Sequence, residues 1–270
     1  MNAVHAGCVT ILAAQMGAAL AAAAAPVQPP SCCAVVELRQ YITYPGKREA
    51  LFTLFEREFI ESQEATGIDV LGQFRDLNDP HRFTWLRGFA SMDARRQSLT
   101  DFYYGDLWKR WKSQANATLY DNDDVLLLRP ASPGSGFVSA AGRAPIGATL
   151  APSALVVATI YHFSQQPDPA FIASFNADLA PVFRRSGAHI LGSFVTESSP
   201  NTFAQLPVRA EARVFVWFAR FDDRSAYARY HAALAEDRVW RDRLFAPLYK
   251  RLARAPETLM LEPAARSLIR

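Results

Sequence analysis

Cysteine is scarce in this chain and confined to one end. Cys8, Cys32 and Cys33 all lie within the first 33 residues. A disulfide framework or a cysteine-rich metal site therefore cannot hold the body of the protein together. The adjacent pair Cys32 and Cys33 is incidental, bonds to itself, or links two chains. Because the five histidines show no spacing that suggests a shared metal, we expect no metal site and no cofactor.

Charged residues are also few, and neither sign dominates. They make up 20% of the 270 residues and give a formal net charge of +3. Residues 34–130 carry 13 Lys and Arg against 15 Asp and Glu, and residues 151–262 carry 13 against 11. This balance argues against a nucleic-acid-binding protein. The hydrophobic share of 50% excludes intrinsic disorder and indicates a globular chain.

Basic residues are missing from the N-terminal region, where Arg39 is the first. The Ala-rich run up to Ala25 predicts a signal peptide at residues 1–25, followed by a Pro-rich spacer at 26–33. Signal peptides usually begin with basic residues, so a start codon assigned too far upstream is the alternative. The run is too short and Ala-rich for a membrane span, which needs roughly 20 strongly apolar residues. We therefore expect no stable span after processing, and an exported protein (periplasmic or secreted) if the leader is cleaved, otherwise a cytoplasmic one.

The chain contains an internal repeat. Aromatic residues and glycines of the first half recur 120 positions later, and an insertion of 12 residues in the second copy then moves the offset to 132. Residues 131–153, rich in Ser, Gly, Ala and Pro, form a linker by composition. The aligned pairs are Tyr41 and Tyr161, Phe55 and Phe175, Gly67 and Gly187, Gly72 and Gly192, Phe74 and Phe194, Trp85 and Trp217, and Phe89 and Phe221.

Both copies predict the same order of elements. Alternating, β-branched segments indicate strands, and apolar residues at helical spacing indicate helices. The order β-α-β-β-α-β is that of a ferredoxin-like unit, so the fold class is α+β with units at 34–130 and 154–262 and a tail at 263–270. Each unit leaves one sheet face bare, so we expect the two to pack sheet to sheet as an intramolecular α/β barrel. The predicted strands are 35–43, 70–75, 82–89, 125–129, 155–163, 189–197, 211–221 and 258–262, and the predicted helices run from about 47 to 67, from 91 with a break near 105, and over 169–185, 224–235 and 237–253.

Charged residues interrupt the strands of the first copy. Glu37 and Arg39 share one face of the first strand with Tyr41. Trp85 and Arg87 share a face of the third strand. Unpaired charges there would cost roughly several kcal/mol each, so they pair with one another or line a wet pocket. We expect the charged face to line a cavity between the two sheets, and the other face to pack on the helices. That other face carries Val36, Leu38 and Ile42, and the second copy replaces the first-strand set with Val157, Thr159 and Tyr161.

Three functions fit this arrangement. In a binding protein, Arg39 and Arg87 hold the anionic or carbonyl group of a small, partly apolar ligand, beside Glu37 and with Tyr41 and Trp85 as walls. In an enzyme, Tyr41 or Glu37 acts as general acid or base in the same cavity. In a scaffold, the barrel is filled and the outer helices contact other proteins; the charges then form a buried ion-pair network that fixes strand register. The sequence leaves open whether the chain forms a homo-oligomer.

Several separated motifs of the first copy resemble those of one family. They are Val-Val-Glu-Leu-Arg-Gln-Tyr at 35–41, Pro45-Gly46, Trp-Leu-Arg-Gly-Phe at 85–89, the aromatic helix through Phe102, Tyr103 and Trp108, and Leu-Leu-Leu-Arg-Pro at 126–130. Over residues 34–130 the chain resembles the NIPSNAP family, which belongs to the dimeric α/β-barrel superfamily. The second copy lacks the Glu-Leu-Arg-x-Tyr strand and is linked to the family through the repeat.

The resemblance implies the barrel fold. It assigns no catalytic residues to this chain, because none are agreed for the family. Mitochondrial members of the family have been tied to trafficking and organelle quality control. Relatives in the wider superfamily include cofactor-free monooxygenases, isomerases and haem-handling enzymes, so a cofactor-free monooxygenase or isomerase-like enzyme is the alternative to a binding protein.

Overall fold

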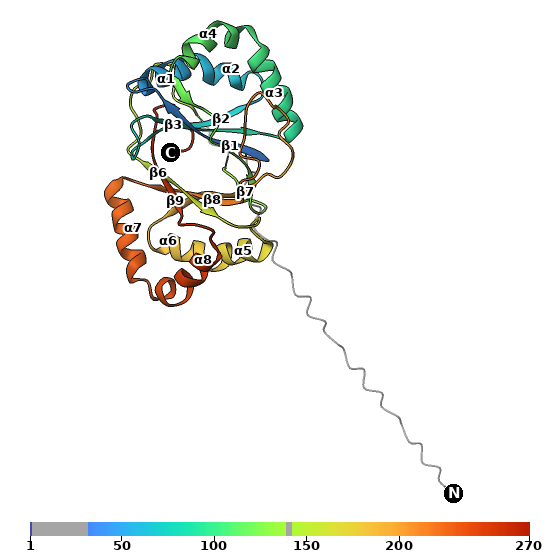
Figure 1. Cartoon of the computed structure of the whole chain (residues 1–270). Helices are drawn as coiled ribbons and strands as arrows, with labels where there is room; N and C mark the ends of the chain where they lie inside the picture. The colour runs from blue at the N-terminus through green and yellow to red at the C-terminus, as the bar shows by residue number, and fades with distance from the viewer. Residues whose placement is uncertain (2–31, 139–141) are drawn as a thin grey trace.

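The computed structural model describes Met1, residues 32–138 and residues 142–270 (Figure 1). Apart from Met1, the predicted signal peptide at 1–25 therefore lies outside the described residues, as does the predicted spacer up to residue 31. Among the residues that are described, no helix is long and apolar enough to cross a membrane.

The first unit has the predicted order of elements, with one short strand added. Ser91 begins the second helix as predicted, because its side chain accepts a hydrogen bond from the Ala94 amide. The short strand β4 (Leu119–Asp121) pairs with the end of β1 and was not predicted. The other elements are β1 (Val35–Thr43), α1 (Arg48–Leu54), the π-helical turn η1 (Phe55–Phe59), α2 (Ile60–Glu64), β2 (Asp69–Asp76), β3 (Arg82–Phe89), α3 (Met92–Tyr104), α4 (Asp106–Asn116) and β5 (Val125–Pro130).

The second unit repeats the order β-α-β-β-α-β, with no counterpart of β4 among its described residues. A π-helical turn recurs at the same point of its first helix, where Phe175 replaces Phe55. Asp223 takes the place of Ser91 as the cap of the second helix. The elements are β6 (Leu155–His162), α5 (Pro169–Ser174), η2 (Phe175–Leu179), α6 (Ala180–Arg185), β7 (His189–Thr196), β8 (Val214–Phe221), α7 (Arg224–Glu236), η3 (Trp240–Leu244), α8 (Phe245–Arg251) and β9 (Glu257–Pro263).

The two sheets close into one barrel. The strand order is β5-β1-β3-β2 in the first unit and β9-β6-β8-β7 in the second, and all pairs are antiparallel. Both edges are joined across the units, because β5 pairs with β7 and β2 pairs with β9. Helices α1 to α4 cover one outer face and α5 to α8 the other (Figure 1). The predicted tandem ferredoxin-like barrel is thus confirmed.

Apolar side chains fill the interior of the barrel. Val36 and Leu38 of the first unit pack there with Phe194 and Phe218 of the second. The predicted assignment of the two faces of β1 is therefore wrong. Tyr41 belongs to the cluster that packs on the helices of the first unit, and Glu37 and Arg39 alternate with the inward-facing residues. The reason is physical: buried charged groups need polar partners, and Gln63 and Arg95 of the helix layer supply them.

The repeated Leu-Gly-x-Phe motif has a steric cause. At Gly72 and at Gly192 the register of the sheet shifts by one residue. A Cβ on Gly72 would lie 2.6 Å from the ring of Phe74, and one on Gly192 would lie 2.9 Å from Phe194. Each glycine thus leaves room for the aromatic ring two residues later to fold inward.

The linker also contributes to the barrel core. Phe137 is buried, with its ring centroid 4.7 Å from that of Phe194 and 5.0 Å from that of Phe218. The amide of Cys32 donates to the Phe137 carbonyl, and Cys32 and Cys33 form a disulfide with each other. The adjacent cysteines are therefore paired within the chain.

Residues 263–270, the predicted tail, pack against the rest of the protein. The Ser267 hydroxyl accepts from the Gln73 amide at 2.9 Å and donates to the Gln73 carbonyl at 2.7 Å. Arg266 is buried and bonds to the Glu56 carbonyl at 2.6 Å and to the Glu61 carboxylate. Ile269 joins the barrel core. The C-terminus therefore lies against β2, between the two units (Figure 1).

Candidate functional site

Four buried charged side chains meet on the helix side of the first sheet. Glu37, Arg39 and Arg87 come from β1 and β3, and Arg95 comes from α3. Glu37 Oε2 accepts hydrogen bonds from Arg39 Nη1 at 2.6 Å and from Arg87 Nε at 2.7 Å, while Oε1 accepts from Arg95 Nε at 2.7 Å. None of the four side chains is exposed. We call this group the charged cluster.

The charged cluster has a surplus of positive charge. Three guanidinium groups surround one carboxylate, so two positive charges lack a counter-charge in the ion pairs of the described residues. Among the residues that the structure describes, the Nη2 atoms of Arg39, Arg87 and Arg95 each lack a hydrogen-bond partner. Buried charge is costly unless it is paired and hydrogen-bonded. Such a cluster favours the nearby binding of an anion.

The electrostatics of the cluster shift the pKa values of Glu37, Arg39 and neighbouring Tyr41. Burial alone would raise the pKa of Glu37, but Arg87, Arg39 and Arg95 together hold that pKa well below its usual range. Burial opposes the charge of Arg39, yet neighbouring Tyr41 and Glu37 raise its pKa. Burial raises the pKa of the Tyr41 phenol, against the influence of Arg39. At neutral pH, Glu37 is therefore ionised and Tyr41 is protonated.

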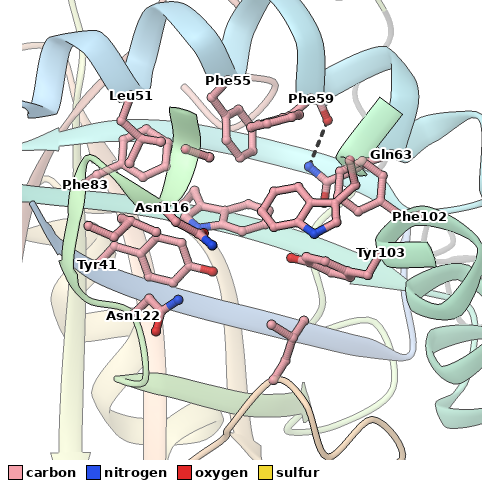
Figure 2. A pocket seen from close by; sticks show the side chains of 15 residues that line it. Tyr41, Leu51, Phe55, Phe59, Gln63, Phe83, Phe102, Tyr103, Asn116 and Asn122 are labelled. Atoms are coloured by element: carbon pink, nitrogen blue, oxygen red, sulfur yellow. Dashed lines mark hydrogen bonds between the residues drawn. The ribbon is translucent and has the colours of Figure 1, made fainter. Parts of the chain in front are cut away.

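An aromatic cavity adjoins the charged cluster, between the first sheet and its helices. Its volume is about 70 Å³. Figure 2 shows Tyr41 and Tyr103 on opposite sides, with their hydroxyl groups turned toward each other. The polar lining residues are Tyr41, Gln63, Tyr103, Asn116 and Asn122, and the apolar ones are Leu51, Phe55, Phe59, Phe83, Trp85, Phe102, Trp108, Ala115, Leu119 and Leu206. We call this space the first cavity.

Two lining residues connect the first cavity to the charged cluster. The Tyr41 hydroxyl accepts a hydrogen bond from Arg39 Nε at 2.7 Å. Gln63 Oε1 accepts from Arg87 Nη1 at 3.2 Å, and Gln63 Nε2 donates to the Phe59 carbonyl at 2.8 Å. Because its oxygen accepts from Arg39, the phenolic hydrogen of Tyr41 can be donated to a group in the cavity. The cavity therefore offers a ligand the Tyr41 hydroxyl as a hydrogen-bond donor, next to the positive charge of Arg39.

Local structure explains how the helices deliver these side chains. Phe55 and Phe59 are the first and last residues of the π-helical turn η1, and Gln63 lies one helical turn further on. A π-helical turn widens the helix and often occurs at functional sites. On α3, Arg95 shares its buried face with Leu99 and Phe102, at helical spacing. The helical segments η1, α2 and α3 thus supply Gln63, Arg95 and aromatic side chains, whereas β1 and β3 supply the other charges.

The second unit lacks the charges at the same positions. The pair Glu37 and Arg87, opposite each other in the sheet, corresponds to Val157 and Ala219. Arg39 corresponds to Thr159, which lies opposite Trp217 as Arg39 lies opposite Trp85. The same supersecondary structure therefore forms without a charged cluster, which argues that the cluster of the first unit serves more than folding.

The predicted site residues fall into two groups. Tyr41 and Trp85 line the first cavity, whereas Glu37, Arg39 and Arg87 form the charged cluster behind them. The predicted ion-pair network among these charges is present. A carboxylate held by three guanidiniums is a weak base, so this geometry disfavours Glu37 as a general base. Catalysis by Tyr41 stays a prediction.

Sequence reasoning missed Arg95, Gln63 and Tyr103 as site residues. A signal existed for the first two, because each is a polar residue at helical spacing from buried aromatic residues: Arg95 from Phe102, and Gln63 from Phe59. Among the described residues, no group of three or more His, Cys, Asp or Glu side chains is arranged to hold a metal ion.

Solved structures of similar fold include two that cover most of the chain. A candidate monooxygenase from Fusobacterium nucleatum shares 9% identity over 85% of this chain and 92% of its own, with a TM-score of 0.53. A candidate monooxygenase from Lactobacillus acidophilus shares 10% identity over 85% and 93%, with a TM-score of 0.50. At such identities the likeness concerns the fold alone.

The first unit also matches a family by sequence. A NIPSNAP family protein from Agrobacterium tumefaciens shares 22% identity over 36% of this chain and 91% of its own, with a TM-score of 0.34. A search of curated proteins gave no significant match. The family model for NIPSNAP matches residues 36–133. The resemblance seen in the sequence is thus confirmed, because this match covers most of the first unit.

Proposed function

We propose that the first unit binds a small, partly apolar ligand that carries a carboxylate or a carbonyl group. The ligand occupies the first cavity, between the sheet and its helices, rather than the interior of the barrel. The observation that carries the proposal is the surplus of two buried positive charges directly behind Tyr41. An anionic ligand would supply part of the missing negative charge.

The roles of the residues follow from their positions. Tyr41 donates its phenolic hydrogen to the ligand oxygen, and Arg39 holds the phenol in place. Aromatic rings such as Phe55 and Trp85, with centroids 4.8 Å apart, surround the apolar part. Charge-assisted hydrogen bonds are roughly twice as strong as neutral ones, so the positive field favours an acid over the corresponding amide.

Arg39→Leu is expected to remove this preference for acids. Butyrate, titrated against butyramide by calorimetry, should bind the wild-type protein about tenfold more tightly than the amide. In Arg39→Leu the acid should bind no better than its amide, because Tyr41 loses its positive partner. Melting followed by circular dichroism checks that the variant is folded.

Thr159→Leu is the matched control, since it makes the same replacement at the equivalent strand position of the second unit. It should leave the preference for acids unchanged. Equal binding of acids and amides by the wild-type protein, or no saturable binding of either, would overturn the proposal. Oxygen consumption in the presence of a bound acid would show that the site also catalyses an oxidation, with Tyr41 as the first residue to test as proton donor.

A further inference from the structure

A loop of the second unit crosses over to the site of the first. Residues 197–213, between β7 and β8, form a connection twelve residues longer than residues 77–81, which occupy the same place in the first unit. This difference is the insertion that moves the repeat offset from 120 to 132. We call residues 197–213 the strap.

The apolar side chains of the strap join the aromatic core of the first unit. Phe203 is 7% exposed, and its ring centroid lies 5.8 Å from that of Tyr103 and 6.4 Å from that of Tyr104. Leu206 and Val208 pack against the same core. Leu206 also lines the first cavity, so the second unit supplies part of the wall of this site.

Polar contacts fix the strap near its start. Asn201 Oδ1 and Thr202 Oγ1 accept hydrogen bonds from Arg95 Nη1 at 3.0 Å and 3.2 Å. The Thr202 hydroxyl donates to the Met92 carbonyl at 3.3 Å. Because Arg95 also binds Glu37, the strap is directly connected to the charged cluster.

A second set of contacts fixes the strap near its end. The Arg209 amide donates to the Val125 carbonyl at 2.9 Å, and Arg209 Nη1 donates to Asp124 Oδ1 at 3.1 Å. Asp124 lies two residues beyond Asn122, another residue that lines the first cavity. Hydrogen bonds before and after Leu206 therefore hold the strap in place. They fix how far the Leu206 side chain reaches into the first cavity.

We propose that the strap sets the upper size limit of the ligands that the first cavity accepts, and that Leu206 is the specificity-determining residue. The inference rests on the proposed function. The cavity of about 70 Å³ is less than half of the roughly 150 Å³ that holds a benzene molecule in an engineered cavity. Most of the wall belongs to helices and strands of the first unit, whereas Leu206 belongs to a loop. A change of size at Leu206 therefore alters the cavity with little effect on the core.

Leu206→Ala tests the size limit. The ratio of the association constants of benzoate and butyrate, measured by calorimetry, is expected to rise about tenfold over the wild-type ratio, because the shortened side chain leaves room for the ring. Leu206→Phe should act in the opposite direction and weaken the binding of both acids. Val208→Ala is the matched control in the same strap, and it should leave the ratio unchanged, since Val208 does not line the cavity.

The outcomes separate this inference from the proposed function. If butyrate binds in a manner that depends on Arg39 but Leu206→Ala leaves the ratio unchanged, the size limit does not lie in the strap. A similar rise in Val208→Ala would likewise overturn the role of Leu206. If neither acid binds the wild-type protein or any variant, the proposed function itself fails, and the inference fails with it.

Discussion

Glu37→Gln is expected to lower the free energy of unfolding by about 3–5 kcal/mol. Glutamine keeps the shape of the side chain but removes the one negative charge that faces Arg39, Arg87 and Arg95 in the charged cluster. Three buried positive charges would then lie together without compensation. Urea unfolding of the two proteins at neutral pH measures the difference.

Glu49→Gln is the control for this prediction. Glu49 also binds an arginine, Arg75 at 2.6 Å, but its side chain is 57% exposed. Removal of an exposed partner costs only about 0–1 kcal/mol. A loss below about 1 kcal/mol in Glu37→Gln would show that the arginines are compensated in another way, and would weaken the case for a bound anion.

The contribution of Glu37 is expected to decrease in acid. Because its three arginine partners hold its pKa below the ordinary value, ionised Glu37 stabilises the folded state at all pH values above the pKa of an unfolded glutamate, about 4.3. As the pH falls below that value, the unfolded chain takes up the proton first and the stabilisation is lost. The difference in stability between the wild-type protein and Glu37→Gln should therefore shrink between pH 6 and pH 3. A constant difference would contradict the depressed pKa.

Deletion of residues 264–270 is expected to cost at least about 3 kcal/mol of stability. The deletion removes Ile269 from the barrel core and leaves the Gln73 backbone without Ser267. It also removes Arg266, which binds the Glu61 carboxylate. Chemical denaturation of the shortened protein, followed by tryptophan fluorescence, gives the value.

Deletion of Arg270 alone is the matched control, because this residue is exposed and should be dispensable. If the longer deletion prevents folding altogether, Ile269→Ala measures the core contribution by itself, with an expected loss of about 2–5 kcal/mol. Stability within 1 kcal/mol of the full chain after the longer deletion would contradict a structural role for the C-terminus.

The order of elements was predictable because it depends on local patterns. The strands β1 and β3 have the bounds that alternation predicts, and the glycine and aromatic repeat reveals the second unit. The barrel follows because each unit must cover one bare sheet face. These are properties of short segments, and a single sequence contains them.

The face of the sheet that carries the site was not predictable in the same way. Val36 and Leu38 are as fully buried as Glu37 and Arg39, so alternation separates the two sets without showing which one faces the barrel. The deciding partner, Arg95, lies 58 residues after Glu37, and its contact exists only once α3 is placed. The position of the strap is harder still to predict from the sequence, because a long loop has no residue pattern that indicates which surface it covers.

Closure of the barrel within one chain has a consequence for symmetry. A barrel made from two copies of one chain would repeat every residue about a two-fold axis. A buried surplus of positive charge would then occur twice, and each half would need the same connections. Here β5 joins β7 and β2 joins β9 inside a single polypeptide, so the halves are free to differ. The first unit carries the charged cluster. The second unit has no such cluster and supplies the longer loop, the strap, to the site of the first.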